Sequence, residues 1–304
     1  MWKMLFRTRI TLRTIALCGL NTLSKKHRKI NLCKILAYLS AFTSPNSTQY
    51  SPKTNMRKSP NYLYSLVFPL QVWAVLLLFG LPATLCVIIL PGRVSRRRVA
   101  QRAGRLLFRL AGIPVMVTGL ENLPAGACFL ASNHCTYMDG PLLTAVLPPR
   151  FGFVIKREAM RMPLVGWLLM RMGSEFVERF NTKTALKDAN RLIQLARDGV
   201  SLGVFPEGTF CREPGLRAFH MGAFLAATRA GIPVVPVVIR GARAILPAET
   251  MRPRPGRVEV ELLAPIMPTG KRGNDARALR DAVRASILMR CGEPDHSHKK
   301  LVNS

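Results

Sequence analysis

His134 and Asp139 lie in the stretch SNHCTYMDG, residues 132–140, and both side chains suit acid–base chemistry. An imidazole accepts a proton near neutral pH, and a neighbouring carboxylate fixes the tautomer of the ring. Residues five apart on one helix point about 140° apart, because a turn contains about 3.6 residues. If the two side chains interact, His134 therefore precedes a helix that begins near Asp139. A helix N-cap beside an unrelated loop histidine is the competing interpretation.

Two further stretches place polar side chains directly after apolar runs. FPEGTF, residues 205–210, contains Glu207, and Gly208 permits close approach of a backbone whose N–H groups bind an anion. GSEFVERF, residues 173–180, ends near Arg179, and arginine suits bidentate binding of phosphate. A plain turn and a surface charge are the competing interpretations of these stretches.

The elements that would position these residues alternate between strand and helix. Runs rich in β-branched and aromatic residues predict strands over 115–119, 127–132, 151–156, 175–178, 201–206, 232–241 and 257–263. Helical spacing of apolar residues predicts helices over 94–112, 140–147, 162–173, 182–199, 217–231 and 274–290. This alternation predicts an α/β fold with a mixed, largely parallel sheet flanked by helices, in which active sites collect at the carboxyl ends of strands. Pro233 and Pro236 predict that their strand is an edge strand or contains a bulge.

Four blocks together resemble the glycerolipid acyltransferase family, which contains the lysophosphatidate acyltransferases. The family motif Asn-His-x-Ser-x-x-Asp is similar to Asn133, His134, Thr136 and Asp139, with Thr in place of Ser. The second motif resembles Gly173, Phe176, Val177 and Arg179. The third motif resembles Phe205, Pro206, Glu207, Gly208 and Thr209. The fourth motif contains a proline and resembles the strand segment 234–237 with Pro236. The order and spacing also match, and the resemblance covers roughly residues 65–290.

The resemblance implies acyl transfer from acyl-CoA or acyl-carrier protein to the free hydroxyl of a lysophospholipid. His134 would be the general base and Asp139 its partner, while Arg179, Glu207, Gly208 and Thr209 would bind the acceptor. Our lead hypothesis is a 1-acylglycerol-3-phosphate acyltransferase that makes phosphatidate for phospholipid biosynthesis, with no cofactor and no metal. Cys135 occupies a variable position of the motif, so we do not assign it as a nucleophile.

One departure leaves the acceptor open. The family usually carries Arg and then Ser after the third motif, whereas this chain has Phe210 and Cys211 followed by Arg212. Arg212 and Arg217 are the alternatives for the missing phosphate contact. Another lyso-lipid, such as lyso-ornithine lipid, is therefore the second candidate acceptor.

The run 63–90 contains no charged residue and is long enough to span a bilayer, which takes about 20 apolar residues. Basic residues flank it, most densely at Arg93, Arg96, Arg97 and Arg98, which favours the cytoplasmic side for the catalytic domain. Pro69, Gly80 and Pro82 interrupt the run, so a single span and a hairpin of helices within one leaflet both stay open. We predict an enzyme of the inner (cytoplasmic) membrane that contacts anionic lipid.

The net charge of +29 is concentrated at the front of the chain, because the first 120 residues contain 19 Lys and Arg and no acid. Segment 1–60 is interpreted as a disordered basic arm, as a transit peptide, or as a non-native extension with the true start at Met56, which we favour. We assign 61–112 to a membrane-anchoring segment, 113–291 to an acyltransferase domain and 292–304 to a disordered tail.

Other functional classes are less well matched by the composition. The 7 cysteines form no CxxC pair, which argues against a structural zinc site or a disulfide framework. A non-catalytic, basic membrane-binding or nucleic-acid-binding protein is the alternative of another class. Nucleic-acid binding would need aromatic side chains among the basic ones, but the aromatics are 7% and lie mainly in apolar segments, so we predict no nucleic-acid partner.

Overall fold

The computed structural model describes residues 62–178, 182–209, 212–247 and 250–298. These residues all fall within the unit Met56–Ser304, and only this unit is described below. The predicted N-terminal extension 1–60 lies outside the described residues, as does Arg179.

A seven-stranded sheet forms the centre, with the strand order β1-β8-β7-β2-β5-β3-β4. The strands are β1 Val115–Thr118, β2 Phe129–Ser132, β3 Gly152–Lys156, β4 Glu175–Val177, β5 Leu202–Val204, β7 Val234–Arg240 and β8 Val258–Leu262. Every neighbouring pair is parallel except β7 and β8, which are antiparallel. The predicted mixed, largely parallel sheet is confirmed, and each strand falls within its predicted range.

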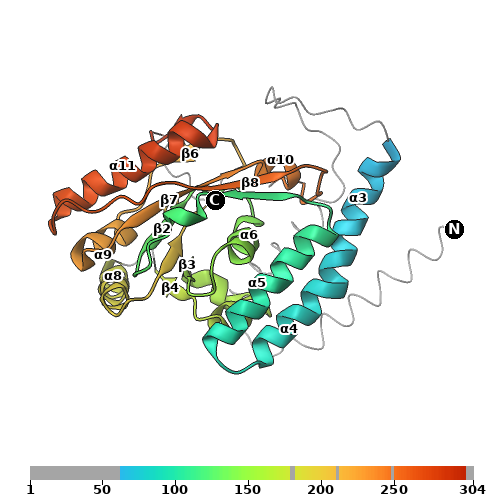
Figure 1. Cartoon of the computed structure of the whole chain (residues 1–304), viewed down its shortest axis with the longest axis horizontal. Helices are drawn as coiled ribbons and strands as arrows, with labels where there is room; N and C mark the ends of the chain where they lie inside the picture. The colour runs from blue at the N-terminus through green and yellow to red at the C-terminus, as the bar shows by residue number, and fades with distance from the viewer. Residues whose placement is uncertain (1–61, 179–181, 210–211, 248–249, 299–304) are drawn as a thin grey trace, which may run out of the picture. The chain divides into compact units, whose positions relative to one another are not determined.

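Helices cover both faces of the sheet (Figure 1). One face packs against α5 (Arg93–Leu110) and α6 (Asp139–Val146), and the other against α8 (Thr182–Arg197), α9 (Gly222–Ala230) and α11 (Gly273–Cys291). Strand β7 serves both cores, because Val235 and Val237 face the first and Val234 and Val238 the second. This alternation follows from the two-residue period of a strand, and burial on both faces explains why β7 is apolar throughout.

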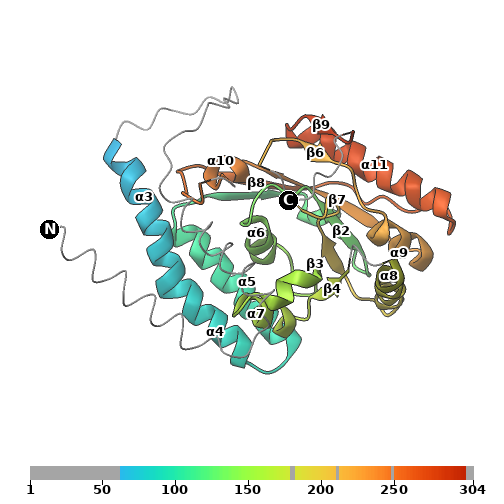
Figure 2. The same ribbon diagram turned by 180° about the vertical axis from the view of Figure 1, so that it is seen from behind.

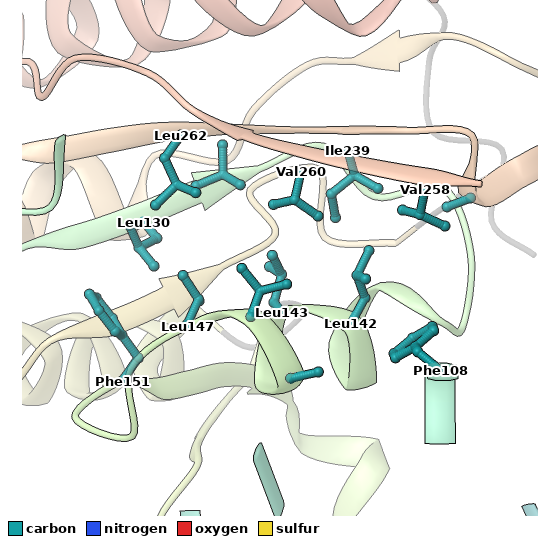
Figure 3. Packing of buried hydrophobic residues seen from close by; sticks show 14 of the residues in the cluster. Phe108, Leu130, Leu142, Leu143, Leu147, Phe151, Ile239, Val258, Val260 and Leu262 are labelled. Atoms are coloured by element: carbon teal, nitrogen blue, oxygen red, sulfur yellow. The ribbon is translucent and has the colours of Figure 1, made fainter. Parts of the chain in front are cut away.

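The core beneath α6 is built from aliphatic side chains of the helix and of three strands. Figure 3 shows Leu142 and Leu143 of α6 facing Ile239, Val258 and Val260 across this core. Helix α5 closes the layer where Gly104 lies so near α6 that an added Cβ would be 3.0 Å from the Cβ of Ala145. Only glycine permits helices to approach this closely, so Gly104 sets the distance between the two helices.

The edge-strand interpretation of the proline-containing strand is wrong, because β7 lies between β8 and β2. The bulge interpretation agrees with the pairing, because Val237 pairs with Leu262 whereas Val234 pairs with Ile266, which leaves one extra residue on the partner side. Pro236 pairs with Ala131 of β2, and its carbonyl accepts the N–H of Leu263 at 2.9 Å. The nitrogen and oxygen of a strand residue face the same neighbour, so the ring nitrogen also faces Leu263, just beyond the end of β8. Pro236 and Leu263 therefore share one hydrogen bond where two other residues would share two, and this loss is confined to the pair just beyond the end of β8.

The apolar run forms one helical rod rather than two helices. α3 (Tyr62–Val75) passes through a π-helical turn, Leu76–Gly80, into α4 (Leu81–Ile89). In the wide turn the N–H of Leu81 donates to the carbonyl of Leu76. This arrangement accommodates Pro82, whose ring would otherwise clash with a carbonyl four residues earlier.

The hairpin is formed instead by this rod and α5, which runs back along it (Figure 1). Near one end of the contact, Gln71 Nε2 donates to the carbonyl of Leu110 at 3.0 Å, and Leu107 packs against Gly80. The predicted hairpin within residues 63–90 is therefore replaced by a hairpin of α3–α4 with α5.

Two of the four arginines after the apolar run point into the protein. Arg97 donates to the carbonyls of Met172 at 2.8 Å, Arg150 at 3.0 Å and Gly173 at 3.1 Å. Arg96 donates to the carbonyl of Leu90 at 2.6 Å and to that of Arg171 at 2.9 Å. Apart from the carbonyl of Arg150, which precedes β3, these carbonyls lie at the C-terminal ends of α4 and α7, where helices leave carbonyls unpaired. They join the helical hairpin to the catalytic domain and are not directed at lipid.

Smaller elements complete the described chain: 3₁₀ helices Leu120–Asn122 and Arg157–Arg161, α7 Val165–Arg171, α10 Ala242–Ile245, and the strands β6 Leu216–Arg217 and β9 Asp295–His296. β6 and β9 pair in parallel, and neither was predicted. The helix predicted from 217 begins only at Gly222, because Arg217 belongs to β6. The predicted disordered tail 292–304 is wrong for 292–298, which the structure describes and which β9 ties to β6.

Candidate active site

His134 and Asp139 meet at the carboxyl end of β2, in the turn that leads into α6. β2 ends at Ser132 and α6 begins at Asp139, so His134 precedes the helix, as the spacing predicts. Nδ1 of His134 lies 2.8 Å from Oδ2 of Asp139. The His134 side chain retains 18% of its exposed surface, whereas Asp139 is fully buried.

The carboxylate of Asp139 is surrounded by hydrogen-bond donors. Oδ2 accepts the N–H groups of Cys135 at 2.6 Å and Thr136 at 2.8 Å, and Oδ1 accepts the Thr136 hydroxyl at 3.0 Å. In each of these three contacts the carboxylate is the acceptor. The contact with His134 therefore assigns the proton to Nδ1 and makes Nε2 the basic nitrogen.

Asn133 anchors this turn to the neighbouring strand β7. Its Nδ2 donates to the carbonyl of Ile239 at 2.9 Å, and its Oδ1 accepts the N–H of Ile239 at 2.8 Å. The side chain is buried, so these two bonds satisfy backbone groups at the end of the β7 ladder. Asn133 thus fixes the start of the turn relative to the sheet.

Glu207 reaches the same turn from the carboxyl end of β5. Its Oε1 accepts the N–H of His134 at 2.7 Å, and its Oε2 accepts the N–H of Arg217 at 3.0 Å. Phe205, on the same segment, stacks on the His134 ring with the ring centroids 4.2 Å apart. Burial raises the pKa of Glu207 to about 7, although the two backbone N–H bonds oppose this shift.

This geometry differs from the predicted contact between Glu207 and the acceptor. The side chain is 3% exposed, and both carboxylate oxygens are directed at backbone N–H groups. The structure therefore uses Glu207 to hold the backbone of the catalytic turn. Gly208 also differs from the expectation, because its N–H donates to the carbonyl of Phe205 at 2.9 Å, and its φ of +80° favours glycine.

The remaining predicted acceptor contacts are only partly within the described chain. Thr209 is half-buried beside the turn, while Arg179, Phe210 and Cys211 lie outside the described residues. Of the two alternatives for the phosphate contact, Arg212 is exposed and Arg217 is buried. Among the described residues, no group of three or more His, Cys, Asp or Glu side chains is placed to hold a metal ion.

The sequence analysis missed a carboxylate that reaches the site from the C-terminal segment. Glu293 accepts two bonds from Arg243, at 2.9 and 3.1 Å, and its Oε2 also accepts the N–H of Gly215 at 2.7 Å. The thiol of Cys135, next to His134, lies 3.5 Å from its Oε1. Glu293 therefore joins the catalytic turn to the loop that follows Glu207.

A second ion pair holds the other side of that loop. Arg284 of α11 donates to the carbonyls of Leu216 at 2.7 Å and Arg217 at 2.9 Å, and it pairs with Asp295 at 2.5 Å. Glu293, Arg284 and Asp295 occupy no motif, and their partners are distant in sequence. The sequence analysis did not predict strand β9. A prediction of this strand would have placed Glu293 and Asp295 beside the loop.

Comparisons with known proteins agree with this geometry. A family model described as "Acyltransferase" matches residues 114–240. A lyso-ornithine lipid O-acyltransferase of Pseudomonas aeruginosa is 31% identical over 195 residues, which cover 59% of this chain and 74% of that protein. The chain belongs to the glycerolipid acyltransferase family. The prediction of an acyltransferase enzyme is thereby confirmed at the level of the family.

Other members of the family carry names that specify the acceptor. A 1-acyl-sn-glycerol-3-phosphate acyltransferase of Chlamydomonas reinhardtii is 26% identical, and the match covers 78% of this chain and 74% of that protein. For a chloroplastic enzyme of the same name from Brassica napus, the match covers only 38% of that protein. The solved structure of PlsC from Thermotoga maritima, titled as the 1-acyl-sn-glycerophosphate (LPA) acyltransferase, shares the fold. Its TM-score is 0.60 at 22% identity, with 74% of this chain and 95% of that chain covered.

Proposed function

We propose that the protein transfers a fatty acyl group from an acyl thioester to the free hydroxyl of 1-acylglycerol-3-phosphate and so makes phosphatidate. The hydrogen bond between His134 Nδ1 and Asp139 Oδ2 is the observation that carries this proposal. Family membership supports a lysophospholipid acceptor, and the names of several relatives specify 1-acyl-sn-glycerol-3-phosphate. The donor is acyl-CoA or acyl-carrier protein.

The proposed reaction uses His134 as a general base. Nε2 removes the proton of the acceptor hydroxyl while its oxygen attacks the thioester carbonyl carbon. Asp139 stabilises the resulting imidazolium, because its charge lies 2.8 Å from Nδ1. The tetrahedral intermediate then breaks its C–S bond, and the leaving thiolate takes the proton from His134. An ester forms, a thioester is broken, and the enzyme returns to its initial protonation state.

A covalent mechanism through Cys135 is not supported by its surroundings. The side chain is buried, and this burial, reinforced by nearby Asp139 and Glu293, raises the pKa of the thiol well above its ordinary value. A thiol of this kind is a poor nucleophile, because the reactive form is the thiolate. We assign direct acyl transfer without an acyl-enzyme.

Acceptor binding remains our prediction for Arg179, Gly208 and Thr209. Arg212 is the exposed arginine of the loop after the third motif, so it replaces the arginine that the family usually carries there. Glu207, with its carboxylate buried, acts on the acceptor only through the backbone that it positions.

We also propose that the protein lies in one leaflet of the cytoplasmic membrane, with the catalytic domain on the cytoplasmic side. The helix over Leu66–Ile89 has 24 residues, is long and apolar enough to cross a membrane, and has only 11% of its most apolar 18-residue stretch buried. However, α5 runs along it and exposes Arg98, Arg102 and Arg109. A transverse span would draw these arginines into hydrocarbon at about 2.5–3.5 kcal/mol each, whereas a rod within one leaflet leaves them at the headgroups.

Lyso-ornithine lipid is the second candidate acceptor. The relative of that name is 31% identical over 74% of its own length. The replacement of the usual Arg-Ser pair by Phe210 and Cys211 also alters the predicted phosphate site, and an acceptor without phosphate does not need Arg212 in place of the usual arginine.

The experiment compares both acceptors with a radiolabelled acyl-CoA and a labelled acyl-carrier protein, using purified protein in mixed micelles. Labelled phosphatidate is the expected product, and faster acylation of lyso-ornithine lipid would replace the lead acceptor by the second candidate. His134→Ala is expected to lower kcat by about a thousandfold. His298→Ala, which changes an exposed histidine outside the site, is the matched control. Unchanged turnover in His134→Ala would contradict the mechanism.

A further inference from the structure

The segment between β3 and β4 presents apolar side chains to solvent. Met160 lies in the 3₁₀ helix Arg157–Arg161, and Met162 comes directly after it. Val165, Trp167 and Met170 belong to α7. Each is at least 40% exposed, and Trp167 reaches 64%. We call these five residues the α7 patch. They form a large apolar surface that the described part of the chain does not cover, and such surfaces mark interaction sites.

The backbone holds this patch in a defined conformation. Leu164 has φ +62° and ψ −52°, and the N–H of Val165 donates to the carbonyl of Pro163 at 2.7 Å, which together form a γ-turn. The N–H of Gly166 donates to the carbonyl of Met162 at 2.8 Å. The γ-turn is strained for a residue with a side chain. The chain thus keeps an unfavourable conformation while its apolar side chains remain outside the core.

The α7 patch adjoins the C-terminal end of the apolar rod. Arg171, at the end of α7, donates to the carbonyls of Ile88 at 2.6 Å and Leu90 at 3.2 Å. Ile89, between these two residues, is 77% exposed. Figure 2 shows α7 close to α4, and the two helices are in contact. The exposed apolar surface therefore continues from the rod onto the catalytic domain.

Charge and side-chain type indicate which partner fits this surface. Lys156, Arg157 and Arg161 are exposed beside the patch, against one exposed acid, Glu158. A tryptophan next to cationic side chains suits the boundary between headgroups and acyl chains, because its ring is apolar and its N–H seeks a polar partner. Continuity with the apolar rod favours a lipid surface over a second copy of the chain or a soluble protein.

We propose that the α7 patch is a second lipid-contacting surface that inserts Trp167 into the same leaflet as the rod. This inference rests on the membrane association proposed above. Two attachment points, joined by Arg171, restrict rotation of the catalytic domain about the rod. The catalytic turn then keeps a fixed orientation toward the lipid from which the acceptor enters.

Tryptophan fluorescence tests the contact directly, since the chain has only Trp2, Trp73 and Trp167. A variant with Trp2→Phe and Trp73→Phe reports on Trp167, and one with Trp2→Phe and Trp167→Phe reports on Trp73 in the rod. Each is mixed with vesicles of phosphatidylethanolamine and phosphatidylglycerol, with and without brominated acyl chains. Co-sedimentation with the vesicles is measured in parallel.

The expected result is that Trp167 emission shifts to shorter wavelength on vesicle binding and is quenched by the brominated chains, as is that of Trp73. The protein could instead co-sediment with the vesicles and show quenching of Trp73 while Trp167 emission stays unchanged. That result overturns the inference about the α7 patch but leaves membrane association intact. Absence of co-sedimentation contradicts membrane association itself. A shift of Trp167 with protein concentration alone, without lipid, identifies self-association and also overturns the inference.

Substitution gives a second measurement. Trp167→Ala is expected to weaken vesicle binding about tenfold, because an interfacial tryptophan buries a large apolar ring. Its rate on acceptor in detergent micelles should stay unchanged, while its rate on acceptor in vesicles falls. Met289→Ala removes a 79% exposed methionine on α11, against the opposite face of the sheet, and is the matched control. Equal loss of vesicle binding in both variants contradicts a specific role of the patch.

Discussion

Asp139 and Glu207 are buried carboxylates that both contact His134, and the atoms they contact give them different roles. Asp139 contacts the ring of His134, so its charge acts on the base itself. Glu207 contacts the backbone N–H of His134, so it holds the position from which that ring extends. Its carboxylate lies in surroundings that oppose ionisation, as its raised pKa shows.

Glu207→Gln should change how stability depends on pH. The pKa of Glu207 is about 7 in the folded protein and 4.5 for a free carboxyl, so between these values the folded state keeps a proton that the unfolded chain has released. The free energy of unfolding therefore falls as pH rises from 4.5 to 7, by about 3 kcal/mol from this group. Melting temperatures of both proteins from pH 4.5 to 8 should show a steeper fall for the wild type. Parallel curves would contradict the raised pKa.

At the scale of elements, the C-terminal segment supports the loop between the third motif and α9. Glu293 connects this loop to the catalytic turn, and the pairing of β6 with β9 fixes its direction. Glu293 and Arg243 both lie outside the matched family region 114–240.

Glu293→Gln is expected to raise the KM for the acceptor about tenfold, equivalent to about 1.4 kcal/mol, because the loop that carries Arg212 loses a charged anchor. The kcat should change less than the KM. Steady-state kinetics at saturating donor measure both constants. Asp281→Asn, which removes an exposed ion pair with Arg280 on α11, is the control. A lower melting temperature with an unchanged KM would show that Glu293 is only structural.

The arginine-rich start of α5 also acts at this scale. Arg97 and Arg98 are neighbours, yet Arg97 donates to three carbonyls of the catalytic domain whereas Arg98 is exposed. Their identical chemistry leads to different roles because the helix turns one inward and the other outward.

Arg97→Ala should lower the free energy of unfolding by about 2–4 kcal/mol, since it leaves helix-terminal carbonyls without donors. Arg98→Ala should change it by less than about 0.5 kcal/mol. Thermal or denaturant unfolding in detergent micelles measures the difference between these matched variants. Equal effects would mean that the inward bonds do not hold the hairpin to the domain.

For the whole molecule, our membrane proposal rests on where the positive charge lies relative to the apolar rod. A run such as Leu66–Ile89 satisfies the length of a span, but the molecule adds α5 with its exposed arginines alongside. Burying those charges would cost about 2.5–3.5 kcal/mol each, which is the reason for our proposal that the rod lies in one leaflet.

The triple change of Arg98, Arg102 and Arg109 to Gln should weaken binding to phosphatidylglycerol-containing vesicles by about a hundredfold or more, because each cation near the surface contributes about 1 kcal/mol. The loss should shrink in high salt, which screens the attraction. Co-sedimentation at two salt concentrations measures both effects. Wild-type binding that does not depend on anionic lipid would contradict the role of these arginines.

The sequence by itself determined the fold class, the strands of the sheet and the pairing of His134 with Asp139. These features are local, because each is visible within one short segment of sequence. The periodicity of apolar residues and the turn residues indicate the strands, and the five-residue spacing indicates the pairing. It also identified the family, because four motifs in order are more specific than any one of them.

Only the tertiary structure decided how several charged residues act, both inside and outside the motifs. Arg97 and Arg98 are alike in sequence, Glu207 was expected to touch the acceptor, and Glu293 was assigned to a disordered tail. Their roles depend on distant partners, such as His134 for Glu207, 73 residues away, and Cys135 for Glu293, 158 residues away. Burial and hydrogen bonding between distant segments exist only after the chain has folded, so no local pattern contains them.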